Sequence, residues 1–251
     1  MKHVLLAILF VTFPVPGLAA SQLQAFTASY SATVNSIPVA GTAERKLTRQ
    51  SDHVWELTFS AGLPFYHFSE QSRFTLDANN RIQPISYQLK KRLMGKNRRA
   101  SVAFDWEHKQ ADSQKDNEHW KLTIQPGDLD KISYQLQLQE DMRQGRKNLD
   151  YQVVNKNHRD DYRFLVESEE TVRIPLGTIK TIRLKRQRDN NKRQTWIWLA
   201  KDWNYMLVKL RQSEKNREYV IVLKEASVEG KTLVPVRVTE NNNKQARRVK
   251  S

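Results

Sequence analysis

Residues 170–226 consist of short apolar runs separated by turn residues. Five segments, each rich in β-branched or aromatic side chains, follow one another: ETVRI, TIKTIRLKRQ, RQTWIWLA, NYMLVKLRQ and EYVIVLKEA. Pro175 and Gly177 suit a type I turn, and residues 189–191 and 213–216 supply the next breaks. Because strands joined by short turns usually pair with each other, this pattern predicts an antiparallel meander.

The middle strands of this meander have apolar side chains on both faces. Trp196 and Trp198 point to one side of their strand, and Ile197 and Leu199 point to the other. A strand with one face in water would alternate apolar with polar residues. The pattern therefore predicts that both faces of the sheet centre are covered, by a helix, a second layer or a bound apolar molecule.

The N-terminal half shows the same period-two alternation, beginning with FTASYSATV at residues 26–34. Further strands are predicted at residues 39–47, 55–60, 65–76, 81–91, 100–106, 120–124, 147–155, 161–167 and 170–174. Residues 109–118 are predicted to be a polar loop. Together the segments predict a mainly β fold, a strongly curved antiparallel sheet or an open barrel.

Residues 127–142 fit two kinds of structure. Four apolar residues alternate as in a strand: Ile132, Tyr134, Leu136 and Leu138. Leu129, Ile132 and Leu136 also share one face of a helix, Asp128 suits the N-cap, and Gln and Glu are abundant. We predict one helix around residues 128–141 that covers an apolar face of the sheet.

Residues 1–19 have the composition of a cleavable export signal. Lys2 is followed by an apolar core at residues 4–13, and cleavage after Ala19 or Ala20 fits the small residues there. The apolar run is short for a membrane span, and the chain has no cysteine for a lipid anchor or a disulfide. We expect a periplasmic protein with one β-rich domain at residues 20–238 and a basic, disordered tail at residues 239–251.

The chain is strongly basic, with 42 Lys and Arg residues against 27 Asp and Glu and a formal charge of +15. In a cytosolic protein this charge would suggest nucleic acid, but the export signal favours anionic envelope lipids, glycans or acidic proteins as partners. Two runs stand out. They contain Lys90, Lys91 and Arg92, and Arg183, Lys185, Arg186 and Arg188. Solvated strand ends without a specific ligand are the simpler explanation of both runs.

Several aromatic residues lie close to the second basic run in the sequence. They are Trp196, Trp198, Trp203 and Tyr205. A rigid aromatic wall with a cationic rim would suit an amphiphile with an anionic head group, and these four residues with the seven basic ones are the ligand-binding candidates. Ordinary core packing explains the aromatic residues at least as well, because large aromatic side chains dominate β cores.

No sequence signature of an enzyme is present. The chain has no Gly-x-Ser-x-Gly motif, no cysteine and no Gly-rich phosphate loop. His67 and Glu70 are three apart in a predicted strand, so their side chains leave opposite faces and would not share a metal ion. We predict no catalytic residue, metal or cofactor. A weaker alternative is a hydrolase of envelope glycans that uses Asp160, Asp161 or Glu170.

The order of several segments resembles a family of exported bacterial proteins whose defining domain has no assigned function. The segments are FTASYSATVNSIPVAGTAERKL, SRFTLDANNRIQPISYQLKK, PGDLDKISYQLQLQEDMRQGR, IPLGTIKT and WIWLAKDWNYMLVKLRQ. The resemblance implies a strongly curved sheet or open barrel with a helix, similar to envelope lipid or lipoprotein carriers, and transfers no catalytic residue. One departure is Met206-Leu207-Val208, where the family pattern has a proline.

Two functional hypotheses follow. The first is a non-enzymatic periplasmic carrier whose curved sheet binds an apolar or anionic amphiphilic envelope component. The second is a scaffolding protein of envelope assembly that binds acidic protein partners through an exposed strand edge and the basic tail.

Overall fold

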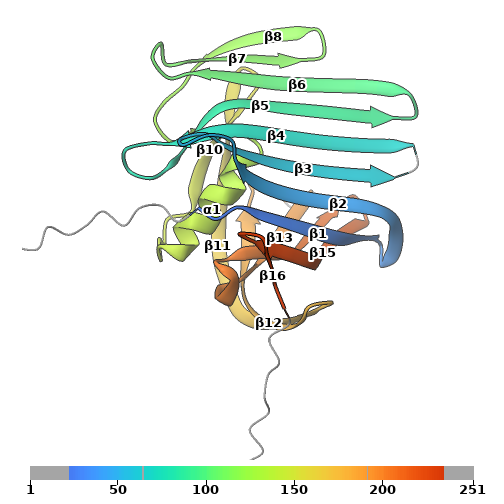
Figure 1. Cartoon of the computed structure of the whole chain (residues 1–251). Coiled ribbons are helices and arrows are strands. Elements are labelled where there is room, and N and C mark those ends of the chain that lie inside the picture. The colour runs from blue at the N-terminus through green and yellow to red at the C-terminus, as the bar shows by residue number, and fades with distance from the viewer. Residues whose placement is uncertain (1–22, 64, 191, 235–251) are drawn as a thin grey trace, which may run out of the picture.

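The structure, a computed structural model, describes residues 23–63, 65–190 and 192–234 (Figure 1). The predicted signal at residues 1–19 and the predicted tail at residues 239–251 lie outside the described residues. The strands are β1 (Phe26–Val34), β2 (Ile37–Arg49), β3 (Trp55–Leu63), β4 (Tyr66–Leu76), β5 (Ile82–Leu93), β6 (Lys96–Asp105), β7 (Gln110–Lys115), β8 (Glu118–Thr123), β9 (Asp128–Leu129), β10 (Asp150–Asn155), β11 (His158–Ile174), β12 (Gly177–Gln187), β13 (Arg193–Ala200), β14 (Met206–Glu214), β15 (Arg217–Val228) and β16 (Lys231–Thr232). The helices are α1 (Ser133–Arg143) and the 3-10 helix η1 (Lys201–Trp203).

All of these strands belong to one curved sheet that does not close, as the sequence predicted. Its order is β8-β7-β6-β5-β4-β3-β2-β1-β15-β14-β13-β12-β11-β10-β9, with β16 beside β15. Neighbouring strands are antiparallel except β9 and β10, which are parallel. The pairing of β1 with β15 joins the two halves of the chain, with Phe26 opposite Val228 and Val34 opposite Tyr219.

The predicted C-terminal meander is confirmed as β11 to β15. Two predicted strand boundaries, the end at residue 167 and the start at residue 170, are absent from the structure. The segments predicted at residues 161–167 and 170–174 form one strand, β11, in which the register against β12 shifts between Val166 and Ser168. A bulge bends a strand without ending it, so the polar residues at this point mark a bulge and not a turn.

The polar loop predicted at residues 109–118 is wrong, because residues 110–115 form strand β7. Its inward positions hold the small residues Ala111 and Ser113, which are buried. The strand pairs with β6 on one side and β8 on the other. Without large apolar side chains the alternation is weak, which is why the sequence pattern did not reveal it.

The predicted covering helix is confirmed, but it begins at Ser133 and not near Asp128. Asp128 belongs to the short strand β9, and its carboxylate binds Arg159 with an Oδ2–Nε distance of 2.8 Å. Ile132 is the N-cap residue, and the side-chain acceptor at the start of the helix comes from Asp130. Its Oδ1 accepts the amide N–H groups of Ile132 and Ser133 at 2.9 and 2.8 Å.

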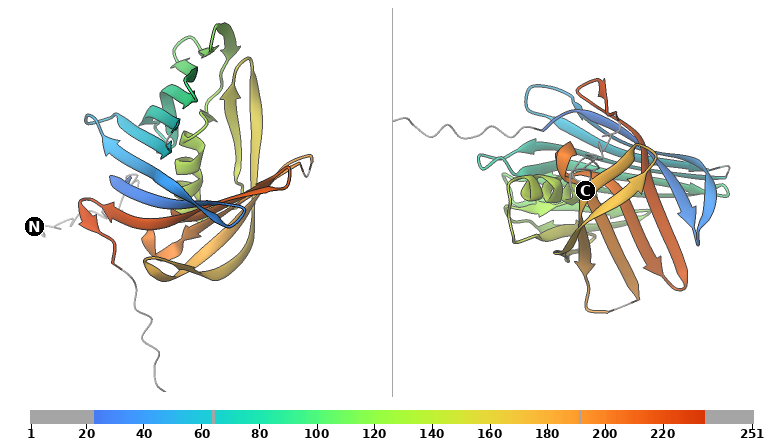
Figure 2. Two further views of the ribbon diagram at one scale, coloured as in Figure 1. Left: turned by 90° about the vertical axis from the view of Figure 1, so that its right-hand side faces the viewer. Right: turned by 90° about the horizontal axis from the view of Figure 1, so that it is seen from below.

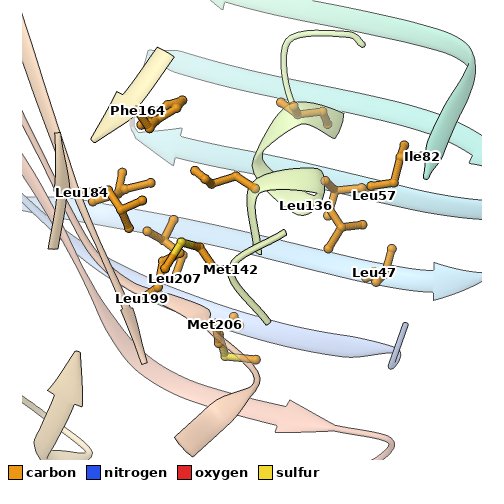
Figure 3. Packing of buried hydrophobic residues seen from close by; sticks show 14 of the residues in the cluster. Leu47, Leu57, Ile82, Leu136, Met142, Phe164, Leu184, Leu199, Met206 and Leu207 are labelled. Carbon is orange, nitrogen blue, oxygen red and sulfur yellow. The ribbon is translucent and has the colours of Figure 1, made fainter. Parts of the chain in front are cut away.

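Helix α1 lies on the concave face of the sheet and packs against both halves of the chain (Figures 2 and 3). Figure 3 shows Leu136 beside Leu57 and Ile82 of the N-terminal strands, with Leu184 and Leu199 of the C-terminal strands on the other side of the helix. All five side chains are buried. The core therefore depends on contacts between segments that are far apart in the sequence.

The helix is too short to cover the whole concave face. Its 11 residues span about 16 Å, whereas a strand such as β5, with 12 residues, spans about 40 Å. Its core contacts, including Phe26, Leu57 and Ile82, lie where β1, β3 and β5 begin. We call the other end of this face, toward the β1–β2, β3–β4 and β5–β6 turns, the open half.

Candidate functional site

The open half contains an apolar hollow with a volume of about 450 Å³. Six adjacent strands, β15, β1, β2, β3, β4 and β5, supply its walls. Its main side chains are Tyr30, Ala32, Val34, Val39, Ala43, Ala61, Leu63, Tyr66, Leu93, Tyr219 and Ile221. Leu93 and Tyr219 remain 45% and 36% exposed, so apolar surface continues to the mouth of the hollow.

Small residues at its centre create the hollow. Ala32, Ala43 and Ala61 occupy inward positions on β1, β2 and β3, where larger residues would fill the space. Gly41 brings β2 close to β3, because a Cβ atom there would lie only 2.3 Å from the carbonyl oxygen of Gly62. The hollow is thus a consequence of side-chain size at a few positions of alternating strands.

A buried arginine lies at the closed end of the hollow. Arg45 is 3% exposed, and its Cζ lies 5.2 Å from the centroid of the Phe26 ring. Burial lowers the pKa of Arg45, and the neighbouring Tyr30, which lines the hollow, partly offsets this effect. Among the described residues no carboxylate forms an ion pair with Arg45, and its Nη2 has no hydrogen-bond partner.

A titratable pair lies on the same concave face, between the core and the open half. The Tyr87 hydroxyl donates to Glu70 Oε1 at 2.5 Å. Burial raises the pKa of Glu70 to about 7; the bond from Tyr87 lowers it, the Asp130 carboxylate raises it and Lys131 lowers it. Glu70 therefore changes its charge near neutral pH.

Glu70 predicts a pH dependence of stability. Its pKa is higher in the folded protein than in the unfolded chain, so the folded state binds more protons between about pH 4.5 and 7. Stability should therefore fall as pH rises through this window. We expect a loss of about 1–2 kcal/mol between pH 5 and 8, after allowing for partial solvent screening. Urea unfolding at a series of pH values measures it.

The Glu70→Gln variant is the control for this prediction. Glutamine keeps an oxygen that accepts the Tyr87 hydroxyl but cannot ionise. The difference in unfolding free energy between the wild type and this variant removes the contribution of the exposed histidines. A difference that stays constant from pH 5 to 8 would show that Glu70 is not the group responsible.

The structure places the aromatic and basic candidates in several parts of the molecule, and it brings four of them together. Trp196, Trp198, Arg183 and Lys185 lie on the face of β12 and β13 opposite to Leu184 and Ile197, here called the outer face, where Arg183 is opposite Trp198 and Lys185 is opposite Trp196. Trp198 is nevertheless buried and belongs to the core cluster, as ordinary core packing would have it. Their neighbours Ile182, Leu184 and Ile197 point to the core.

The outer-face candidates are engaged with one another. The Trp196 ring lies between Lys185 Nζ at 5.5 Å and Arg211 Cζ at 5.1 Å, measured to its centroid. Arg183 Nε lies 3.0 Å from Glu167 Oε2, and Trp198 Nε1 donates to Glu170. These contacts describe a network that stabilises the outer face.

The remaining candidates of the C-terminal half lie elsewhere. Arg186 Cζ is 3.3 Å from the centroid of the Tyr162 ring, on the inner face. Arg188 donates to Thr195 Oγ1 at 3.2 Å, and burial lowers the pKa of Arg188 to about 10. Trp203 and Tyr205 pack against the core, and Trp203 lines a small cavity of about 150 Å³ beside α1.

The three basic candidates of β5 divide between the two faces. Lys91 shares the inner face with Tyr66, and its Nζ lies 5.5 Å from the ring centroid. Lys90 and Arg92 point to the outer face and are exposed. Only Lys91 of the eleven candidates therefore lies beside a residue that lines the hollow.

The carboxylates considered for a glycan hydrolase are held in separate contacts. Asp160 accepts a hydrogen bond from Asn155 at 2.9 Å and Asp161 accepts one from Gln152. Glu170 binds Trp198 and Arg183 on the outer face. Within the described ranges, no group of three or more His, Asp or Glu side chains is arranged to hold a metal ion.

Sequence reasoning missed the hollow and its lining. The available signal was the series of small residues at inward positions of β1, β2 and β3, such as Ala32 and Ala61. Alternation predicts that these residues face inward, but it does not predict which part of the inner face the helix leaves uncovered.

Comparison with known proteins identifies the relatives of this chain. A family model described as "Protein of unknown function (DUF3108)" matches residues 29–224. No curated protein matches. No helix in the described part of the chain is long and apolar enough to span a membrane.

One solved structure has a similar fold. It is the beta-barrel-like protein of a domain of unknown function, DUF1849, from Brucella abortus, with 9% sequence identity and a TM-score of 0.54; the match covers 83% of this chain and 99% of that one. Two others are much less similar, with TM-scores of 0.32. They are PNGF-II, at 10% identity over 82% of this chain and 28% of that one, and a lipoprotein-like protein from Parabacteroides distasonis, at 11% identity over 83% and 97%.

Proposed function

This chain belongs to the DUF3108 family of proteins of unknown function, and from its geometry we propose that it is a non-enzymatic periplasmic carrier. It holds an apolar or anionic amphiphilic envelope molecule in the open half of its concave face. The periplasmic location rests on the export signal predicted at residues 1–19.

The apolar hollow is the observation that carries this proposal. Its volume of about 450 Å³ is within the range of about 300–1,000 Å³ typical of small-molecule sites. Its lining is almost entirely apolar, whereas a sheet face that is in contact with water normally carries polar side chains. A hydrocarbon chain in this position would bury side chains such as Val34, Leu63 and Leu93.

Lys91 supports the anionic part of the proposal. It lies on the inner face at the mouth of the hollow, beside Tyr66, where a head group would emerge from the apolar lining. The ammonium group would attract a phosphate or carboxylate without needing to be buried. Arg183 and Trp198, in contrast, are engaged with carboxylates on the outer face.

Native mass spectrometry of the mature protein from its own periplasm, followed by organic extraction, tests for a natural ligand. We expect one amphiphile per chain to be released. A clean apo mass, together with no binding of a fluorescent fatty acid, would contradict the carrier proposal. Co-purification of acidic envelope proteins with the ligand-free protein would favour the scaffolding alternative.

A substitution at Ala32 tests whether the hollow itself binds. Ala32 faces the hollow between Val39 and Ile221, so Ala32→Trp places an indole in its centre. We expect the affinity for a fluorescent fatty acid to fall at least about tenfold. Titration of the probe into the wild type and the variant measures the change.

The matched control is Ser31→Trp. Ser31 is the neighbouring residue on β1, is exposed and faces the other side of the sheet. We expect its affinity for the probe to stay within about twofold of the wild type. Equal binding by both tryptophan variants would place the ligand outside the hollow.

A further inference from the structure

Two hairpin turns at the mouth of the hollow display large apolar side chains. Phe65, in the β3–β4 turn, is 84% exposed, and Met94, in the β5–β6 turn, is 81% exposed. The Met94 amide donates to the Phe65 carbonyl oxygen at 3.0 Å, so the two turns are held side by side. In Figure 1 both turns lie at the right-hand end of the N-terminal strands.

The backbone at both positions is unfavourable for such residues. Phe65 has a φ of 106° and Met94 a φ of 48°, in the left-handed region that costs bulky L-residues on the order of 1 kcal/mol or more. The other described non-glycine residues with positive φ are polar, apart from Tyr205, which packs against the core. Phe65 and Met94 thus combine backbone strain with exposure of apolar surface to water.

Basic residues lie on the two strands that the β5–β6 turn connects. There are six of them: Lys90, Lys91, Arg92, Lys96, Arg98 and Arg99. Within the described part of the chain, only Arg98 of these six forms an ion pair, with Asp116 at 2.8 Å. The remaining cations are available for external anions.

Ile37 extends the apolar surface at the same end. It lies at the β1–β2 turn and is 69% exposed. Leu93, at the end of β5, is 45% exposed and also lines the hollow. Apolar surface therefore runs from the turns into the hollow without interruption by a charged lining residue.

We propose that this end of the molecule docks on a lipid bilayer with anionic head groups. Phe65 and Met94 enter the interface between head groups and acyl chains, while the Lys and Arg side chains of β5 and β6 contact lipid phosphates. Apolar side chains combined with a basic rim are the arrangement that binds an anionic membrane surface. The two strained apolar side chains are exposed in the free protein and would be buried in lipid when the protein is bound to the membrane.

This inference goes beyond the proposed function and rests on the turns rather than on the content of the hollow. The docking surface and the hollow are adjacent in the structure. A bilayer in contact with Phe65 and Met94 lies at the mouth of the hollow, so an acyl chain passes between membrane and protein along Leu93 without crossing water.

Cosedimentation with vesicles tests the proposal. We expect the mature protein to bind vesicles of phosphatidylglycerol and phosphatidylcholine in equal parts, and to bind phosphatidylcholine vesicles weakly. Binding should weaken as salt is raised. The double variant Phe65→Ser/Met94→Ser should lose at least about tenfold in partition coefficient.

The matched control is Leu165→Ser/Val166→Ser on β11. These residues are also apolar and 49% and 52% exposed, but they lie far from the turns in the sheet order. We expect this control to bind vesicles as the wild type does. Equal losses in the two double variants, or equal binding to both vesicle types, would overturn the proposal.

Two further readouts separate membrane docking from ligand binding in the hollow and from self-association. Binding of a soluble fluorescent fatty acid by Phe65→Ser/Met94→Ser should remain, and its loss would show that the turns belong to the hollow and not to a docking surface. Vesicle binding by Ala32→Trp should remain even if the carrier proposal fails. The proposal would also be overturned if the wild type did not bind vesicles but sedimented as a dimer, and the turn substitutions dissociated this dimer. That result would assign the turns to self-association.

Discussion

Replacing Asp130 with alanine is expected to lower the free energy of unfolding by about 3–5 kcal/mol. Asp130 is fully buried, and each of its carboxylate oxygens has a role. Oδ1 accepts the amide groups of Ile132, the residue before α1, and of Ser133, its first residue, and Oδ2 accepts the Ser72 hydroxyl of β4 at 2.5 Å. Alanine would leave these buried donors without partners and would uncouple the helix from the N-terminal strands.

Urea unfolding followed by tryptophan fluorescence measures this effect, with two control variants. Asp130→Asn keeps an oxygen for the helix amides and should cost only about 1 kcal/mol. Asp202→Ala removes an exposed carboxylate in η1 and should cost less than about 0.5 kcal/mol. An Asp130→Ala loss as small as that of Asp202→Ala would mean that Asp130 does not anchor the helix.

Replacing Arg45 with methionine is expected to raise the free energy of unfolding by about 1–4 kcal/mol. The guanidinium is buried, stays charged and has no carboxylate partner among the described residues, so its desolvation is poorly compensated. Methionine keeps an unbranched apolar stem against Phe26 and removes the charge. The prediction is unusual because most core substitutions destabilise.

Urea unfolding also measures this change, and Arg45→Lys is the control. Lysine keeps a buried ionisable amine of similar length, which either stays charged without a partner or loses its proton at a free-energy cost, so it should give no gain in stability. A gain for methionine alone would show that the protein keeps Arg45 for a reason other than stability. A loss of more than about 2 kcal/mol for methionine would instead show that the contacts with Phe26 and Tyr30 outweigh the desolvation cost.

The division of the concave face explains how one short helix leaves room for a ligand site. Asp130 and Leu136 hold α1 over one end of the face, where Leu57 and Ile82 complete the core. The other end keeps its apolar lining but has no layer of described residues over it. The stability of the fold therefore comes mainly from the covered half, and substitutions in the open half, such as Ala32→Trp, should affect binding more than folding.

Prediction from sequence succeeded where one strand or one helix face carried the information. The alternation in residues 178–187 and 193–200 correctly predicted β12 and β13, with Arg183 and Trp198 on the face opposite to Leu184 and Ile197. The helix was predicted from the spacing of Leu136 and its neighbours. Its start was misplaced because two acidic residues, Asp128 and Asp130, compete for the cap in the sequence, and only the pairing of β9 with β10 decides between them.

The arrangement of the candidate site residues depends on the tertiary structure. The sequence placed Trp196, Trp198, Trp203 and Tyr205 in one wall because they are close along the chain. The structure keeps Trp196 and Trp198 on one face of β13, whereas Trp203 in η1 and Tyr205 after it are partly buried and pack against the core cluster. Of the basic candidates, Lys91 lies at the mouth of the hollow, and that position depends on the pairing of β5 with β4.

The sequence by itself determined most of the strands, the covering helix, the two-sided apolar centre and the membership of a bacterial family of unknown function. These follow from periodicity and local turn chemistry, which act over a few residues. Only the tertiary structure decided the pairing of β1 with β15, the length of sheet that α1 leaves uncovered, and the meeting of Phe65 with Met94 beside the hollow. Each depends on contacts between distant segments, whose strength is set by shape and packing that no single segment encodes.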